Sequence, residues 1–397
     1  MSGAPTPIEV SVILPCLNEA DTLARCLQKI QRAFAEEDIT GEIIVADNGS
    51  TDGSIDIATA AGAWVVRVTE RGYGNALLGG IAAARGKFVI MGDADDSYDF
   101  LELPKFTRKL REGFDLVQGC RLPAGGGTVR PGAMPWLHRW LGNPFFTLLV
   151  RRWFGATVND VYCGLRGFKR ELVADLDLRS AGMEFATEMI IKASLRGKRV
   201  AEVPITLHPD GRKAHAPHLR TFRDGWRTLR FFLLCCPRWL FVMPGLGLAT
   251  FGLLGYAVAL PGLRINSINF DAHTLLFASL FLMSGFQSIA FAVATKTYAV
   301  HENLLPEDRW HRRFESLFSL EKGLIVMAVM CLLGGALLGL AVNDWRLASF
   351  GNLDYSHTMR RVIPGATLVG LGIQTGFASF FISLLGIRRR PAPSTAS

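Results

Sequence analysis

The sequence has no Cys-x-x-Cys motif and no visible internal repeat, and its first residues lack the pattern typical of a secretory leader. Its seven cysteines include no Cys-x-x-Cys pair, and because their number is odd, neither a zinc site nor a disulfide framework is expected. We expect reduced thiols in a cytosolic compartment. Residues 1–7 are rich in small residues and proline, and no apolar stretch follows them, so no signal peptide is expected. No period of 20–50 residues is visible, which excludes a repeat fold.

The composition fits neither a soluble enzyme nor a uniform membrane bundle. The 397 residues are 49% hydrophobic and still 20% charged. A membrane bundle would carry fewer charges, and a soluble enzyme would have fewer long apolar runs. We therefore expect two unlike parts joined end to end. The formal net charge of +8 is compatible with nucleic acid, anionic lipid or phosphorylated ligands, and the positions of the basic residues must decide among them.

Residues 8–212 alternate strand-like and helix-like patterns. Four short apolar runs are typical of buried strands, at 10–15, 42–47, 63–68 and 88–91. Asn18 and Asp21 are expected to cap the helix after the first strand. The alternation predicts an α/β domain with a doubly wound, Rossmann-like sheet. Ligands of such sheets bind beyond the carboxyl ends of the strands, where Asp47 and Asp93 lie.

From residue 239 the sequence changes to long apolar runs, at about 239–261, 273–295, 323–342 and 364–387. Each run is long enough to cross a hydrocarbon core of about 30 Å as a helix. We therefore predict an all-α domain of about four transmembrane helices over 239–387, followed by a tail at 388–397.

The distribution of Lys and Arg predicts the orientation of these helices. Basic residues concentrate in 296–322 and in the tail, whereas 262–272 has one arginine and 343–363 has three. The positive-inside rule places both termini and the α/β domain in the cytoplasm. We expect an integral, multi-pass protein of a bacterial or archaeal cell membrane.

A juxtamembrane segment, 213–238, joins the two parts. It has arginines on one helical face and apolar side chains on another: Arg220, Arg223, Arg227 and Arg230, and Phe222, Trp226, Leu229 and Leu233. This pattern predicts an amphipathic helix in the membrane interface. Its arginines either anchor the chain to anionic lipid or hold a substrate phosphate. Basic residues beside a bilayer indicate no nucleic-acid partner.

The acidic run Asp93-Ala94-Asp95-Asp96 directly follows the fourth predicted strand. Carboxylates this close repel one another unless a cation is present, and Mg²⁺ or Mn²⁺ suits one or two carboxylates together with substrate phosphates. The alternative is an acidic N-cap of a helix that begins after Ser97. Asp47 either accepts hydrogen bonds from a base or ribose or only caps the turn after it. Gly72-Tyr73-Gly74 opens a helix, but a lone Gly-x-Gly is weak evidence for a dinucleotide fold.

Several motifs together resemble family 2 glycosyltransferases. Three occur in the order and spacing of that family: Pro15-Cys16-Leu17-Asn18-Glu19, Asp47-Asn48-Gly49-Ser50-Thr51-Asp52 and Asp93-Ala94-Asp95. The chain is more narrowly similar to the branch of dolichol-phosphate mannose synthase and polyprenyl-phosphate glucosyltransferases. That similarity rests on Gln118-Gly119-Cys120-Arg121, on Asp-Val-Tyr-Cys-Gly-Leu-Arg at 160–166, on Glu184-Phe185 with Glu188, and on Val203-Pro204-Ile205 before Arg212. It covers 8–235 and, beyond that, only the presence of C-terminal spans.

The resemblance implies a GT-A fold with a mixed sheet and assigns roles to the motif residues. Nucleotide-sugar contacts are implied for Pro15, Asn18, Glu19, Asp47, Asn48, Asp93, Ala94 and Asp95, with Asp93 and Asp95 at a Mg²⁺ or Mn²⁺ ion. Lipid-phosphate contacts are implied for Arg121, Arg212 and Lys213, and the helix pattern adds Arg220 and Arg223. The expected catalytic residues are Asp95, Asp96, Arg121 and Arg212. Relatives continue toward Gly-x-Ser-Lys after the arginine, whereas Lys213-Ala214-His215 stands here, so the basic residue in that lysine's place stays open.

These expectations define a metal-dependent hexosyltransferase that uses a nucleotide sugar of the GDP-mannose or UDP-glucose type. Its acceptor is a polyprenyl or dolichyl phosphate at the cytosolic membrane face, and the family's in-line attack would invert the anomeric carbon. A lipid monophosphate is largely ionised near neutral pH, so it needs little help from a base.

Three alternatives stay open. Another lipid acceptor, such as a diacylglycerol, would need a base, for which Asp96 is available. A growing polysaccharide is a second acceptor, although no Gln-x-x-Arg-Trp motif of processive synthases is present. The third is a non-catalytic membrane protein with a degenerate transferase domain. The sequence also leaves open whether copies of the chain form a homo-oligomer.

Overall fold

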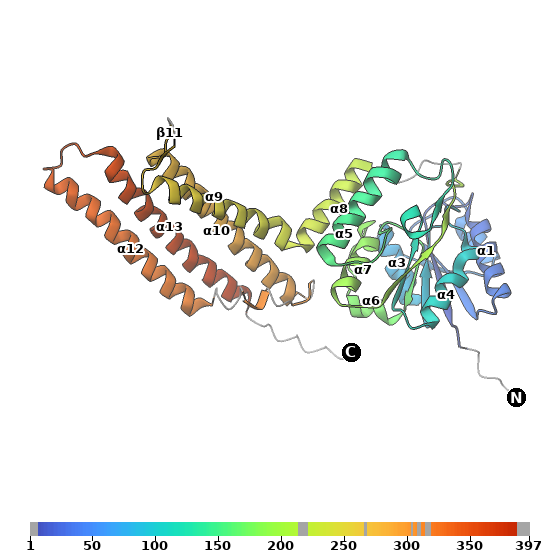
Figure 1. The fold of residues 1–397 in the computed structure, drawn as a ribbon. Helices are drawn as coiled ribbons and strands as arrows, with labels where there is room; N and C mark the ends of the chain where they lie inside the picture. Colours follow the sequence, from blue (N-terminus) through green and yellow to red (C-terminus); the bar gives the residue numbers. More distant parts are fainter. Residues whose placement is uncertain are drawn as a thin grey trace, which may run out of the picture. The chain divides into compact units, whose positions relative to one another are not determined.

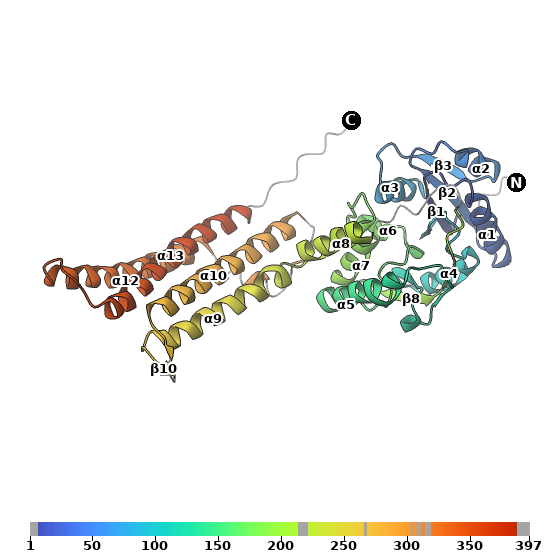
Figure 2. The same ribbon diagram turned by 90° about the horizontal axis from the view of Figure 1, so that it is seen from above.

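The structure is a computed structural model of the chain, shown from two directions in Figures 1 and 2. It describes residues 7–212, 221–265, 268–302, 305–307, 311–313 and 319–386. The chain divides into two compact units, Met1–Phe232 and Leu233–Ser397. Lys213 and Arg220, two of the predicted phosphate-binding residues, lie outside the described residues, as does the predicted tail.

The first unit is built on a seven-stranded sheet in the order β3-β2-β1-β4-β7-β5-β8. Its strands are β1 (Val10–Cys16), β2 (Gly41–Asp47), β3 (Trp64–Arg67), β4 (Phe88–Met91), β5 (Leu116–Cys120), β7 (Arg166–Lys169) and β8 (Val200–Pro204). β1 pairs in parallel with β2 and β4, and β7 runs antiparallel between β4 and β5. The predicted α/β fold with a mixed sheet is confirmed, and all four predicted strands are present.

Helices cover both faces of this sheet (Figure 1). Successive strand residues point to opposite faces, so Val12 and Leu14 share a core with Leu27 of α1, while Ile13 meets Gly80 of α3 on the other side. The helices are α1 (Leu23–Glu36), α2 (Ser54–Ala60), α3 (Tyr73–Ala83), α4 (Leu103–Arg111), α5 (Asn143–Phe154), α6 (Glu171–Leu176), α7 (Glu184–Leu195) and α8 (Thr221–Cys235). Short elements fill the connections: η1 (Phe100–Glu102), η2 (Pro123–Gly125), η3 (His138–Gly142), β6 (Thr128–Val129) and β9 (Thr206–Leu207).

Two expected helix N-caps are wrong. The N-cap position of α1 is Thr22, not Asn18 or Asp21. The helical segment after the acidic run starts at Phe100, and its N-cap is Asp99, which accepts a hydrogen bond from the Leu101 N–H. The acidic run therefore does not supply this cap.

Helix α8 packs against α5 through Phe232. The Phe232 ring lies edge-to-face with Phe146, at 5.9 Å between centroids, and with Phe154, at 6.1 Å. Phe232 and Thr228 are buried, one helical turn apart, whereas Trp226 is 61% exposed. Trp226, one of the apolar side chains predicted to face the membrane interface, is thus exposed, and the interfacial position of the helix stays a prediction.

The second unit contains, within its described residues, four helices long and apolar enough to span a membrane. They are Arg238–Ala259, which joins η4 (Arg238–Val242) to α9 (Met243–Ala259), then α10 (Ala272–His301), α12 (Leu320–Leu347) and α13 (Tyr355–Leu385). Helix α10 packs against α9 and α13, and α13 also packs against α12. The hydroxyls of Tyr256, Ser279 and Thr367 join α9, α10 and α13 at 2.7–3.0 Å. The predicted number of candidate spans is confirmed.

The helices extend beyond the predicted spans. The predicted loop 343–363 is mostly helical, and only 348–354 separates α12 from α13. Arg360 and Arg361 lie in α13 and pair with Asp271 and Asp344. A hydropathy pattern predicts that a span ends where charged residues begin. In the folded chain these arginines are paired with carboxylates, so the helix can continue through them. The 262–272 connection contains a short hairpin of β10 (Arg264–Ile265) and β11 (Ile268–Asn269).

Candidate functional site

Three loops meet at the carboxyl ends of β1, β2 and β4. Asp47 is the last residue of β2 and stands in register with Cys16, the last residue of β1. Asp93 comes two residues after the end of β4. Because parallel neighbouring strands end at the same sheet edge, these loops form one surface, as the sequence predicts.

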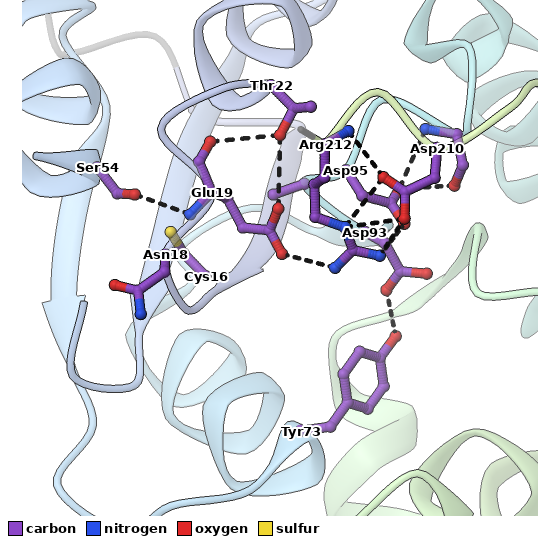
Figure 3. Close-up of polar contacts among 12 residues, drawn as sticks. Cys16, Asn18, Glu19, Thr22, Ser54, Tyr73, Asp93, Asp95, Asp210 and Arg212 are labelled. Atoms are coloured by element: carbon purple, nitrogen blue, oxygen red, sulfur yellow. Dashed lines mark hydrogen bonds and ion pairs between the residues drawn. The ribbon is translucent and has the colours of Figure 1, made fainter. Parts of the chain in front are cut away.

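Arg212 lies among three carboxylates at this edge (Figure 3). Its guanidinium is 3.1 Å from the Glu19 carboxylate and 3.2 Å from that of Asp95, and it also pairs with Asp210. The Gly211 N–H donates to the Asp95 carbonyl at 2.9 Å, which brings the 210–212 turn to the acidic run. Arg212, Glu19 and Asp95 are thus brought together as predicted residues, and Asp210 is one that the sequence analysis missed.

Asp93 lies deeper in the site and accepts a hydrogen bond from the Tyr73 hydroxyl at 2.8 Å. Burial, and after it the charge of Asp95, raises the pKa of Asp93 to about 6, while Tyr73 and the guanidinium of Arg212 act in the opposite direction. The cost of ionising Asp93 is therefore set by its surroundings and its acidic neighbour, and a bound cation would lower that cost.

A divalent metal fits the Asp93 and Asp95 pair as part of a shared coordination sphere. Within the described residues, no group of three or more His, Cys, Asp or Glu side chains could hold a metal ion by itself. Mg²⁺ and similar hard cations commonly take only one or two protein carboxylates and complete their shell with phosphate oxygens and water. A carboxylate pair with mutual repulsion at a strand end suits this mode of binding.

Asp95 and Asp96 point to different partners. One Asp95 oxygen accepts from the Ser97 N–H at 3.0 Å and from its hydroxyl at 2.6 Å, and the other faces Arg212. Asp96 has a φ of +61° and pairs with Lys29 at 2.9 Å and Arg25 at 3.4 Å, both on α1. The structure therefore does not bring Asp96 into the contacts around Arg212.

Arg121 is a buried arginine with a buried partner. Its guanidinium donates two parallel hydrogen bonds to the Asp160 carboxylate, at 2.7 and 2.8 Å, and its backbone N–H donates a third at 3.0 Å. Its positive charge still acts on Asp93, where it opposes the rise in the pKa of that carboxyl. Arg121 therefore contributes a fixed charge beneath the site.

The predicted nucleotide loops are fastened to each other. The Asn18 N–H donates to the Ser50 hydroxyl, and its side-chain carbonyl accepts from the Thr51 N–H at 2.8 Å. The Glu19 N–H donates to the Ser54 hydroxyl at 2.9 Å. Asn18 adopts a φ of +60°, a conformation that asparagine tolerates better than most residues. The loop after Pro15 is thereby held to the turn after β2.

Asp47, Asn48 and Ala94 have structural contacts of their own. Asp47 accepts from the N–H groups of the turn that follows it, at 3.0 and 3.2 Å. The Asn48 amide donates to the carbonyls of Val68 and Glu70 and accepts from the Gly72 N–H. Ala94 is buried, and its carbonyl meets the Cys26 thiol. Asn48 thus clamps the segment between β3 and α3.

The first unit also exposes a large apolar surface that the sequence analysis missed. It runs from Trp136, just before η3, through η3 into α5: Trp136 is 72% exposed and Leu148 63%, with Trp140, Leu141 and Phe145 between them. Arg151 and Arg152 lie in the last turn of α5. Aromatic side chains beside arginines are typical of a helix at a membrane surface. The Trp and Arg residues that recur over 136–153 are the feature of the sequence that could have indicated this surface.

Comparison with known proteins agrees with this geometry. Residues 11–177 match the family model described as glycosyl transferase family 2, and residues 293–386 match glycosyltransferase family 2 C-terminal transmembrane region. A low-salt glycan biosynthesis hexosyltransferase of Haloferax volcanii is 37% identical over 384 residues, which cover 96% of this chain and 90% of that protein.

The names of two further relatives include a lipid phosphate. A dolichyl-phosphate hexose transferase of Haloferax volcanii is 34% identical over 198 residues, 50% of this chain and 82% of that protein. An undecaprenyl-phosphate 4-deoxy-4-formamido-L-arabinose transferase of Pseudomonas syringae is 30% identical over 307 residues, 73% of this chain and 85% of that protein. With its catalytic fold, its acidic strand-end site and its membrane region, this chain belongs to glycosyltransferase family 2 and is a membrane-bound glycosyltransferase.

Proposed function

We propose that the protein transfers a hexose from a nucleotide sugar to a polyprenyl phosphate. The observation that carries the proposal is the 3.2 Å contact between Asp95 and Arg212. At this contact the Asp95 carboxylate, which suits a metal ion bound to the donor diphosphate, lies next to the Arg212 guanidinium, which suits a phosphate. The reaction must bring two anions together, and this site offers a binding group for each. The names of the dolichyl-phosphate and undecaprenyl-phosphate relatives support the same acceptor class.

The donor side of the site is formed by the strand-end loops. Asp93 and Asp95 would hold Mg²⁺ or Mn²⁺, and that ion would neutralise the charge that develops on the departing diphosphate. Residues 15–19, together with Asp47, form the surface against which the nucleotide would lie. Arg212 would hold the acceptor phosphate in line with the anomeric carbon, which is a positioning effect.

The bond changes need no general base. An oxygen of the lipid phosphate bonds to the anomeric carbon as the bond from that carbon to the diphosphate breaks, and the nucleoside diphosphate leaves with the electron pair. The acceptor phosphate is already largely ionised, its second pKa being about 6, so no proton has to move first. Attack from the side opposite the leaving group inverts the anomeric configuration.

The position of Asp96 favours a phosphate acceptor over a neutral hydroxyl. A hydroxyl acceptor such as a diacylglycerol needs a base in the transition state. Asp96 was the candidate, but its carboxylate pairs with Lys29 at 2.9 Å and with Arg25. These ion pairs hold the Asp96 carboxylate against α1, so it takes no part in the contacts around Arg212, where the acceptor would bind.

The membrane features support catalysis at the cytosolic face. The exposed apolar surface of η3 and α5 and the exposed Trp226 of α8 would lie against the bilayer, where the headgroup of a polyprenyl phosphate is found. The basic residues near the spans support a cytoplasmic catalytic unit and cytoplasmic termini through the positive-inside rule.

A transfer assay tests the proposal. Purified full-length protein in liposomes is incubated with undecaprenyl or dolichyl phosphate, Mn²⁺ or Mg²⁺, and a panel of radiolabelled nucleotide sugars. We expect a lipid-linked sugar that mild acid releases, and its loss with EDTA. Asp95→Asn should insert into membranes and lose transfer, whereas the control Asp115→Asn, at the opposite end of the sheet beside Lys169, should keep it. Label in a neutral glycolipid or a polymer would contradict the acceptor class.

A further inference from the structure

Tyr73 reaches the acidic pair from a turn that the sequence analysis treated only as a weak glycine motif. It is the first residue of α3, and its hydroxyl donates to Oδ1 of Asp93 at 2.8 Å (Figure 3). The other carboxylate oxygen, Oδ2, lies beside Gly164, where an added Cβ would come within 2.7 Å of it. The Asp93 carboxylate is thus restrained through one oxygen and closely packed at the other.

The turn that carries Tyr73 is fixed from two sides. On one side, the Gly72 N–H donates to the Asn48 side chain at 2.7 Å. On the other, the Gly74 N–H donates to the Ala181 carbonyl at 2.9 Å. Glycine is required at both positions, because a Cβ would lie 2.3 Å from the Ala181 oxygen at residue 72 and 2.0 Å from the Ser180 oxygen at residue 74. The backbone of 180–181 therefore sits directly on the Tyr73 turn.

The 179–181 segment is itself held by a buried carboxylate. Glu188 of α7 accepts hydrogen bonds from the N–H groups of Arg179 and Ser180, the latter at 2.9 Å, and pairs with Lys192 at 2.7 Å. Glu188 and Lys192 are both buried, so these contacts are shielded from water. A continuous chain of contacts thus runs from Glu188 through the 180–181 backbone to Tyr73 and Asp93.

We propose that Tyr73 is a positioning residue of the metal and donor site. Its hydroxyl restrains the Asp93 carboxylate that would hold the divalent cation, and the Asn48 and Glu188 contacts hold the tyrosine in place. The hydrogen bond would act as outer hydrogen-bond partners do in other metal sites, where they orient the ligating carboxylates. This inference rests on the proposed function, because it needs a cation at Asp93.

Tyr73→Phe tests the role, because it removes the hydroxyl and keeps the ring. Mn²⁺ is titrated into purified full-length protein in the presence of a saturating nucleoside diphosphate, and free Mn²⁺ is followed by electron paramagnetic resonance. The nucleotide is UDP or GDP, according to the donor that the transfer assay identifies. We expect the Kd for Mn²⁺ to rise about 10- to 100-fold. In the transfer assay the KM for Mn²⁺ should rise more than kcat falls, since the cation still binds at saturation. The thermal midpoint should match the wild type.

Two further variants separate the possible results. Tyr355→Phe, an exposed tyrosine at the start of α13, makes the same chemical change far along the chain and should leave Mn²⁺ binding unchanged. Asp93→Asn should lose Mn²⁺ binding. If Asp93→Asn loses binding and Tyr73→Phe binds Mn²⁺ as the wild type does, the role of Tyr73 is wrong while the proposed function stands. If Asp93→Asn also binds Mn²⁺ as the wild type does, the metal assignment itself is wrong.

Discussion

Arg212 and Asp95 lie 117 positions apart in the sequence and form an ion pair at 3.2 Å. Arg212 is also within 3.1 Å of Glu19, so one guanidinium joins the first strand loop to the acidic run. The pairs are largely buried and are therefore less screened than surface ion pairs. The arginine that is proposed to hold the acceptor phosphate thus contacts the carboxylate that is proposed to hold the donor's metal.

Two replacements of Arg212 should distinguish the contribution of its positive charge from that of its planar guanidinium. Arg212→Gln removes the cation and should lower kcat for transfer by roughly 10²- to 10³-fold, the usual cost of losing one preorganised donor at a developing or bound anion. Arg212→Lys keeps the charge without the planar fork, so we expect a smaller loss with a raised KM for the lipid phosphate. The control is Arg32→Gln, which changes an exposed arginine paired with Glu36. Activity of Arg212→Gln within a few-fold of the wild type would refute the role.

Much of this site could be predicted from the sequence because strand ends converge. Asp47 and Asp93 follow short apolar strands, and the sheet brings them to one edge whatever their loops do. Asp210 and Tyr73 could not be found in this way. Their contacts depend on the path of the 210–212 turn and on the 180–181 backbone against Gly72 and Gly74, which only the folded chain shows.

In the membrane unit, too, the sequence predicted some features and could not predict others. Hydropathy is a sum over neighbours in sequence, so it located four spans. It could not see that Arg360 and Arg361 pair with Asp271 and Asp344 across helices, and it therefore placed a loop where α13 is helical. On α8, likewise, the spacing predicted an amphipathic helix, but only the position of α5 determines that Phe232 is buried and Trp226 exposed.

Removing one partner of the buried Arg121–Asp160 pair should destabilise the first unit. Asp160→Asn leaves the Arg121 guanidinium buried without a carboxylate, which typically costs about 3–5 kcal/mol. We expect the denaturation midpoint of the full-length protein to fall, followed by circular dichroism. Asp175→Asn, which breaks the more exposed pair with Lys198, should change the midpoint far less. Equal midpoints for the two variants would show that the buried pair adds no stability.

The buried thiols should be unreactive in the native protein. Burial raises the pKa of Cys26, Cys120 and Cys163 to about 12 each. At pH 8 the thiolate fraction of each is then on the order of 10⁻⁴, and it increases only as the pH approaches those values. A disulfide-exchange reagent at pH 8 should therefore titrate fewer than seven thiols natively and all seven after unfolding in detergent. Cys163→Ser should lower the unfolded count by one and leave the native count unchanged. Rapid reaction of all seven thiols in the native protein would contradict this expectation.

The exposed surface of η3 and α5 should matter for lipid acceptors and not for the donor. Trp140→Ser combined with Leu148→Ser removes two exposed apolar side chains from that surface. If both lie in the bilayer interface, losing about 1.5–3 kcal/mol of apolar burial raises the KM for a long-chain polyprenyl phosphate in liposomes roughly tenfold or more. The KM for the nucleotide sugar should not change, because neither Trp140 nor Leu148 takes part in the contacts described for the strand-end loops. Trp64→Ser is the matched control, since Trp64 is also exposed but lies on the edge strand β3 beside Arg85. If the double variant and the control gave the same lipid KM as the wild type, the η3 and α5 surface would have no part in reaching the membrane acceptor.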